Sequence, residues 1–168
     1  MSKRICITFA GAIGSSKTPI ANYLSVKLNL PVFNNDAVRT EVTEDLGKFD
    51  SVEHIKRRNK RLKEITKSGI SFICDLSVDR EWKMLKKLLV KNKYRWFIIS
   101  LDLSKQFLIK LYKVKGYSNS LNVLDKFWND HDNFIKNNGN EIGLHISDVD
   151  FKNRCETSFK KVRKYLNV

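Results

Sequence analysis

Short apolar runs alternate with longer amphipathic stretches along this 168-residue chain. The first run, Ile5–Ala10, is followed by Lys17–Leu28, in which apolar residues at 20, 24 and 28 recur as on one helix face. Strands that helices cover on both faces are apolar throughout, whereas the covering helices are amphipathic. The alternation therefore predicts an α/β fold built on a mainly parallel sheet.

Four further apolar runs extend the pattern to five strands. They cover Pro31–Phe33, Ile70–Asp75, Trp96–Leu101 and Leu144–Ile146. Helices are also expected over Asp36–Leu46, with Asp36 as N-cap, and over Val52–Lys67, Asp79–Lys91, Ser104–Val114, Leu121–Lys136 and Phe151–Leu166. No repeat, low-complexity tract or linker interrupts the series, so residues 1–168 are expected to form a single domain.

A loop rich in glycine and serine joins the first strand to the first helix. It reads Gly11-Ala12-Ile13-Gly14-Ser15-Ser16-Lys17-Thr18 and fits the Walker A pattern except that Ser16 replaces the second glycine. Backbone N–H groups of such a loop and the N-terminal end of the next helix bind phosphates. Lys17 suits the β- and γ-phosphates and the Thr18 hydroxyl suits magnesium. The alternative is an ordinary strand-to-helix turn, because Ser16 lacks the backbone freedom of glycine.

Carboxylates follow the second and third strands, where parallel sheets form their ligand crevice. Asp36 and Arg39 share one helix face at i and i+3. The carboxylate can accept the proton of an attacking hydroxyl, and the guanidinium can hold an anion. Asp75 is the last residue of the third predicted strand, and its carboxylate is placed to orient a magnesium ion or the water bound to it. The plainer alternatives are a helix cap for Asp36 and a solvated charge for Arg39.

With these segments in order, the chain resembles the small P-loop kinases of the polynucleotide 5′-hydroxyl kinase type and the wider zeta-toxin-like and small-molecule kinase group. The motifs that carry the resemblance are Gly11–Thr18, Asp36-x-x-Arg39, and Asp75 followed by Arg80. If Arg80 has no role in the site, it is expected to form a salt bridge with Asp79 or Glu81.

The resemblance implies a three-layer P-loop NTPase fold with a central five-stranded sheet and a small helical lid at about residues 105–136. It also implies ATP and Mg²⁺ as cofactors. The catalytic residues would be Lys17, Asp36 and Arg39, the nucleotide would lie on Gly11, Ala12, Ile13, Gly14, Ser15, Ser16, Lys17, Thr18 and Lys115, and the metal would bind Thr18 and Asp75.

In this family a lid helix donates arginines to the transferring phosphoryl group. The corresponding stretch, residues 108–116, contains no arginine, so Lys110, Lys113 or Lys115 would act as a point charge instead. Tyr112 and Tyr117, beside the lid turn, are placed to stack on a base.

Basic residues exceed acidic ones by 32 to 18, which gives a net charge of +14. Such a surplus attracts polyanions, although a lysine-rich composition explains it equally well. The densest run, Lys56–Lys63, is either a nucleic-acid track or a solvated helix face. His54, His131 and His145 form no triad or metal spacing and are assigned no role.

The preferred function is an ATP- and Mg²⁺-dependent kinase for the 5′ hydroxyl of a nucleic acid. The alternatives are a kinase for a nucleoside, sugar or antibiotic, and a nucleotide-binding protein with little turnover. No apolar run approaches the roughly 20 residues of a membrane span, no apolar segment follows the Met-Ser-Lys-Arg start, and the three cysteines are dispersed. A cytoplasmic protein with no membrane segment is expected, with oligomeric state and acceptor identity left open.

Overall fold

A five-stranded parallel sheet forms the centre of the protein. The computed structural model describes residues 4–167, with the backbone alone at 118–120, so the Met-Ser-Lys start lies outside the described residues. The strands are β1 (Ile5–Ala10), β2 (Val32–Asn34), β3 (Phe72–Ser77), β4 (Arg95–Leu101) and β5 (Ile142–Ile146). Their order is β2-β3-β1-β4-β5, and every neighbouring pair is parallel. The predicted α/β class and five-stranded parallel sheet are confirmed.

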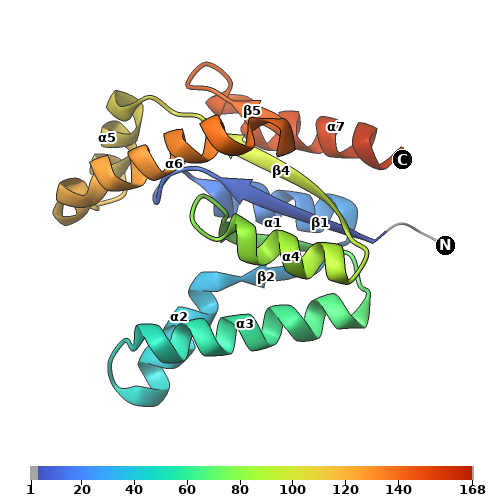
Figure 1. Cartoon of the computed structure of the whole chain (residues 1–168). Helices are drawn as coiled ribbons and strands as arrows, with labels where there is room; N and C mark the ends of the chain where they lie inside the picture. The colour runs from blue at the N-terminus through green and yellow to red at the C-terminus, as the bar shows by residue number, and fades with distance from the viewer. Residues whose placement is uncertain (1–3, 168) are drawn as a thin grey trace.

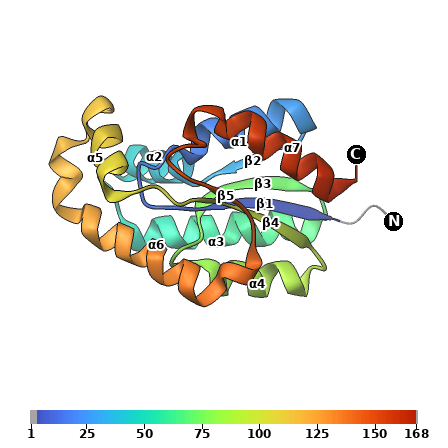
Figure 2. The same ribbon diagram turned by 90° about the horizontal axis from the view of Figure 1, so that it is seen from above.

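Helices cover both faces of the sheet. They are α1 (Lys17–Leu28), α2 (Asn35–Leu46), α3 (Ser51–Ser68), α4 (Trp82–Lys91), α5 (Lys105–Val114), α6 (Leu124–Asn138) and α7 (Arg154–Leu166). Short 3₁₀ turns occupy Ser118–Val123, Gly139–Glu141 and Phe151–Asn153. Helices α1 and α7 lie on one face and α3, α4 and α6 on the other, which gives three layers (Figure 2). Helices α2 and α5 lie toward the carboxyl ends of the strands (Figure 1). None of the described helices combines the length and the apolar character that crossing a membrane requires.

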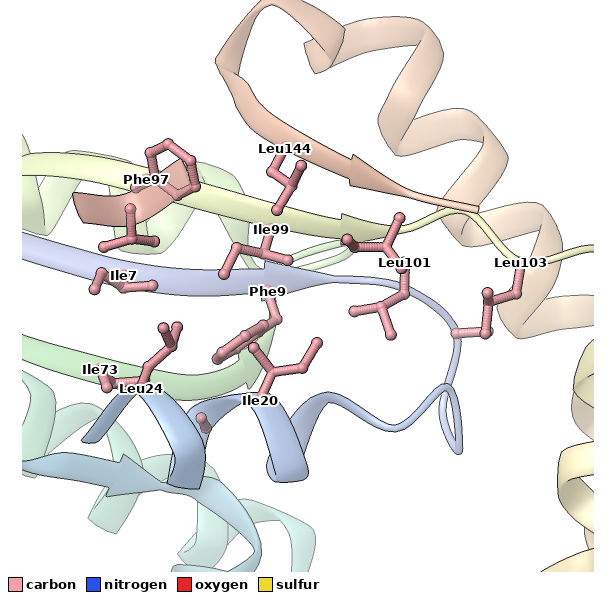
Figure 3. Close-up of a cluster of buried hydrophobic side chains, with 14 of the residues drawn as sticks. Ile7, Phe9, Ile20, Leu24, Ile73, Phe97, Ile99, Leu101, Leu103 and Leu144 are labelled. Carbon is pink, nitrogen blue, oxygen red and sulfur yellow. The ribbon is translucent and has the colours of Figure 1, made fainter. Parts of the chain in front are cut away.

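Alternate residues of β1 supply the two hydrophobic layers. Ile7 and Phe9 pack toward α1, where they meet Leu24 (Figure 3). Cys6 belongs to the opposite layer, with Leu85 of α4. All five side chains are fully buried. A strand covered on both faces has to be apolar at every position, which is why Ile5–Ala10 contains a single polar residue.

Strand β3 extends two residues beyond the predicted end at Asp75. The pairing of β1 with β3 shifts register between Thr8 and Phe9, and the Thr8 hydroxyl donates to the carbonyls of Cys74 (3.1 Å) and Leu76 (3.3 Å). Asp75 therefore lies inside the strand, opposite Asn34 of β2. Because Asn34 is the last residue of β2, Asp75 is still at the carboxyl edge of the sheet, close to Lys17.

Four predicted helix starts are wrong. Helices α6 and α7 begin at Leu124 and Arg154 instead of Leu121 and Phe151, since the residues before them form 3₁₀ turns. The N-cap of α2 is Asn34, whose Oδ1 accepts from the N–H groups of Asp36 (2.8 Å) and Ala37 (3.1 Å), so Asp36 stands in the first turn and not at the cap. Helix α4 begins at Trp82 instead of Asp79, because the Asp79 carboxylate is engaged by the loop after β1.

Candidate active site

The Gly11–Thr18 loop leaves β1 at the carboxyl edge of the sheet and enters α1. Gly14 has φ 80°, and a Cβ built on it would lie 2.5 Å from the ring of Tyr112, so only glycine fits there. Ser16 has φ 78° and ψ 40°, in the left-handed region. A residue with a side chain in that region costs roughly 1 to 2 kcal/mol. Ser16 thus adopts the backbone conformation that glycine usually supplies.

Lys17 lies across the mouth of this loop. Its ammonium donates to the carbonyls of Gly11 (2.7 Å) and Ala12 (2.8 Å) and to the Ser15 hydroxyl (3.1 Å). Burial lowers the pKa of Lys17 to about 8, and the negative charge of Asp79 acts in the opposite direction. A phosphate offers this cation a charged partner in place of neutral carbonyls, which is the stronger hydrogen bond.

Thr18, Asp75 and Asp36 surround Lys17. The Thr18 hydroxyl is near enough to the Asp75 carboxylate to act on its pKa. Burial raises the pKa of Asp75, while the Thr18 hydroxyl and the Lys17 charge act to lower it. Asp36 is exposed on the first turn of α2 and is near enough to influence the titration of both Lys17 and Asp75. The structure therefore brings one cation, one hydroxyl and two carboxylates together at the loop.

The two arginines of the predicted motifs have different surroundings. The guanidinium of Arg39 lies 4.0 Å from the ring centre of Phe49, on the exposed side of α2. Arg80 Nε lies 3.6 Å from Oδ2 of Asp130, and its guanidinium is 5.2 Å from the ring centre of Phe127. Arg80 therefore faces α6, and the expected pairing with Asp79 or Glu81 is wrong.

Helix α5 and the residue that follows it contact the Gly11–Thr18 loop. The Tyr112 hydroxyl donates to the carbonyl of Ile13 (2.6 Å), and the fully buried ring packs on Gly14. The expectation that Tyr112 stacks on a base is therefore wrong. Lys115 Nζ donates to the carbonyl of Gly14 (2.6 Å), whereas Lys110 is exposed on the same helix. Lys113 is exposed as well, so Lys115 is the lysine of this trio that reaches the loop.

The arginines of the basic run in α3 are ion-paired inside the protein. Arg58 is buried, and its two terminal nitrogens donate to the carboxylate of Glu81 at 3.1 and 3.2 Å. Arg61 pairs with Glu41 (2.6 Å). Arg57 contacts Glu41, Glu53 and Asp45. These pairings join α3 to α2 and to the segment before α4, and they engage the guanidinium groups that a nucleic-acid track would use. The exposed face of α3 carries lysines at 56, 60, 63 and 67.

A buried network of two carboxylates and a histidine was not predicted from the sequence. The N–H of Gly11 lies 3.2 Å from both oxygens of Asp79, and the Ser77 hydroxyl donates to Asp79 (3.0 Å). His131 of α6 lies 3.0 Å from Asp79 through Nδ1 and 3.0 Å from Asp102 through Nε2. Separations of 52 and 29 residues along the chain left no local pattern that could have revealed it.

The charge of His131 follows from these contacts. Burial disfavours the protonated ring, but the hydrogen bonds to Asp102 and Asp79 outweigh it and raise the pKa of His131 to about 9. Hydrogen bonds from His131, Ser100 and His145 also lower the pKa of Asp102, against the effect of its burial. With a pKa of about 9, we expect the ring to carry its proton at neutral pH, where it lies between the carboxylates of Asp79 and Asp102.

A cavity of about 350 Å³ lies next to this network. The loop after β4, the turn after β5 and α6 form its walls. Its lining residues are Asp102, Leu103, Ser104, Trp128, His131, Asp132, Ile135, Ser147, Asp148 and Val149. Its size falls within the usual range of small-molecule sites.

Comparisons with known proteins support the fold. No family model matches the sequence. No curated protein matches it either. Among solved structures, a candidate kinase from Chloroflexus aurantiacus J-10-fl is 17% identical, with a TM-score of 0.71 over 99% of this chain and 98% of that one. Shikimate kinase from Bacteroides thetaiotaomicron is 11% identical (TM-score 0.61, 98% and 99% covered). The APS kinase CysC of Mycobacterium tuberculosis is 15% identical (TM-score 0.62, 97% and 99% covered). The chain therefore has the three-layer fold of the P-loop kinases.

Proposed function

We propose that this protein is an ATP- and Mg²⁺-dependent kinase that transfers the γ-phosphate to a hydroxyl group of a small molecule. The observation that carries the proposal is the convergence of Lys17, Thr18, Asp75 and Asp36 on the Gly11–Thr18 loop. The similar solved structures include a shikimate kinase and an APS kinase, which favours a small acceptor over a nucleic acid.

The residues beside Lys17 fit a magnesium ion. Mg²⁺ prefers oxygen ligands, keeps several waters, and is commonly held by one or two protein groups together with substrate phosphates. The Thr18 hydroxyl and the Asp75 carboxylate are close neighbours beside Lys17 and supply such oxygens. No cluster of three or more His, Cys, Asp or Glu side chains suited to a metal occurs in the described part of the chain. When bound, the ion would neutralise charge on the phosphates.

The transfer assigns one role to each group. Lys17 and the loop N–H groups hold the β- and γ-phosphates, and Lys115 brings a second cation from the lid at residues 105–136. The acceptor hydroxyl oxygen forms a bond to the γ-phosphorus while the bond from that phosphorus to the ADP oxygen breaks. The hydroxyl proton passes to the Asp36 carboxylate, and Arg39 on the same face orients an anionic or polar part of the acceptor. The cavity beside Asp102 is the candidate site for the adenine base.

A nucleic-acid acceptor is the second candidate. The net charge of +14 and the exposed lysines of α3 favour it. The internal pairing of the α3 arginines speaks against it, because those guanidinium groups are the better phosphate ligands.

The deciding experiment is a transfer screen with ATP labelled at the γ-phosphate. Small hydroxyl compounds, nucleosides, and DNA and RNA oligonucleotides serve as acceptors, with Lys17→Ala as the matched control. Labelled small-molecule product with wild type and none with Lys17→Ala supports the proposal. If only oligonucleotides become labelled, the protein is a kinase for the 5′ hydroxyl of a nucleic acid instead. ATP binding by calorimetry without transfer to any acceptor would leave a nucleotide-binding protein.

A further inference from the structure

A chain of hydrogen bonds runs from Gly11 of the phosphate-binding loop to His131 of α6 and Asp102, and it includes none of the groups that the proposed transfer step uses, namely Lys17, Thr18, Asp36 and Asp75. The N–H of Gly11 is held by Asp79, and Asp79 Oδ1 lies 3.0 Å from Nδ1 of His131. The second ring nitrogen, Nε2, lies 3.0 Å from Oδ1 of Asp102, just beyond the end of β4. Three elements that are distant in sequence therefore meet at one imidazole ring.

The two carboxylates, Asp79 and Asp102, determine the protonation state of the His131 ring. An ionised carboxylate only accepts hydrogen bonds, so both ring nitrogens must donate, and only the protonated imidazole has two donors. The side chains of His131 and Asp79 are each 6% exposed, so the contact between them is shielded from water, whereas Asp102 is 25% exposed. Removing the ring would leave a buried carboxylate without its cation, which is strongly unfavourable.

The position of Asp79 links this cluster to the loop. The Ser77 hydroxyl lies 2.9 Å from the Gly11 carbonyl and 3.0 Å from Asp79 Oδ2 and shares its single proton between them, so the peptide groups on both sides of Gly11 have partners in β3 and the turn after it. Gly11 has φ 137°, a conformation that side-chain-bearing residues rarely adopt, and it sets the direction in which the loop leaves β1.

We propose that His131 is a positioning residue for the phosphate-binding loop: it fixes Asp79, and Asp79 fixes the backbone of Gly11. The inference rests on the proposed function, since it takes this loop to be the nucleotide site. Because His131 belongs to α6, the helix that follows the lid turn, the same ring joins the lid to the loop. A nucleotide that orders the loop would then also restrain α6.

The test compares His131→Gln with a matched control, His145→Gln. His145 contacts the other oxygen of Asp102 but is not bonded to Asp79, and its side chain is 51% exposed. In His131→Gln, the amide of Gly11 should lose hydrogen-exchange protection in the ligand-free protein. Its dissociation constant for Mg²⁺–ATP should rise on the order of tenfold, as when the outer partners of binding groups are removed. His145→Gln should stay within about twofold of wild type in affinity. Equal behaviour of the two variants would overturn the proposal.

A double-mutant cycle checks the route through Asp79. Asp79→Asn alone should weaken ATP binding, and Asp79→Asn with His131→Gln should be no weaker, because the histidine has lost the group through which it acts. Additive losses would show that His131 acts by another route. If His131→Gln does not fold, ¹⁵N-histidine-labelled wild type still decides: both ring nitrogens of His131 should carry protons at pH 7, and a neutral ring would contradict the proposal.

These outcomes separate this inference from the proposed function. If wild type binds no ATP while Gly11 exchange still depends on His131, the nucleotide function fails and the positioning role stands. If wild type binds ATP and His131→Gln matches His145→Gln, the function stands and the positioning role fails.

Discussion

Ser16 is strained in the position where the Walker A pattern has glycine. Its φ of 78° is one that residues with a Cβ avoid, and its hydroxyl makes only a long contact (3.5 Å) with Lys115. Ser16→Gly should therefore stabilise the fold by about 1 kcal/mol and increase ATP affinity, because the loop no longer stores this strain. Urea unfolding and calorimetry measure the two effects. A large loss of affinity would show that the Ser16 hydroxyl itself takes part in binding.

Asp36 tests chemistry separately from binding. Because Asn34 caps α2, Asp36→Asn removes no cap and should leave the melting temperature and ATP affinity near wild type. Phosphoryl transfer should fall by about 10²-fold or more, the usual scale for a lost general base. Single-turnover transfer measured beside calorimetry separates the effects. A parallel fall in stability and transfer would assign Asp36 a structural role.

Helix α3 derives part of its stability from a buried arginine. Arg58→Ala leaves the Glu81 carboxylate without its bidentate partner, so the free energy of unfolding should fall by about 2 to 3 kcal/mol. Lys60→Ala on the exposed face of the same helix is the matched control and should change it by no more than about 0.5 kcal/mol. Urea denaturation measures both. If Arg58→Ala and Lys60→Ala lower the free energy of unfolding equally little, Arg58 behaves as a solvated charge and the prediction is wrong.

Helix α5 supplies its loop contact through Lys115. Lys115→Ala should lower the rate of phosphoryl transfer by about 10- to 100-fold, as when one charge-stabilising donor is removed. Lys115→Arg should retain or exceed wild-type transfer, because a planar guanidinium suits the developing charge. Lys110→Ala, at an exposed position of the same helix, serves as the control. Loss of transfer in the control as well would mean that α5 acts through its packing.

The pH dependence of folding should reveal the buried histidine. The pKa of His131 is raised from 6.5 to about 9, so its stabilising effect is complete below pH 6.5 and disappears as the pH rises through 9. Lys17 acts in the opposite sense, since its lowered pKa of about 8 adds stability as the pH rises from 8 toward 10.5. The free energy of unfolding of wild type minus that of His131→Gln isolates the histidine. This difference should fall between pH 6.5 and 9, by at most about 1.4 kcal/mol per pH unit. Parallel profiles would contradict the charge assigned to the ring.

Part of the fold could be predicted from local sequence patterns. The alternation of apolar and amphipathic segments predicted the α/β class and the five parallel strands, because a strand covered on both faces must be apolar along its length. The spacing of Gly11, Gly14, Lys17 and Thr18 predicted a loop between β1 and α1, which the structure has, and the binding of phosphate by that loop stays a prediction. Both are properties of consecutive residues.

Contacts between distant segments required the tertiary structure. The pairing of Arg58 with Glu81 spans 23 residues and the approach of Lys115 to Gly14 spans 101, and no local spacing encodes either. The register shift in β3 placed Asp75 inside its strand, and three separate elements converged on His131. Sequence by itself determined which segments become strands, helices and the loop, because those choices depend on neighbouring residues. Only the folded chain decided which charges are neutralised within the protein and which remain at the site, because burial and pairing depend on elements brought together by packing.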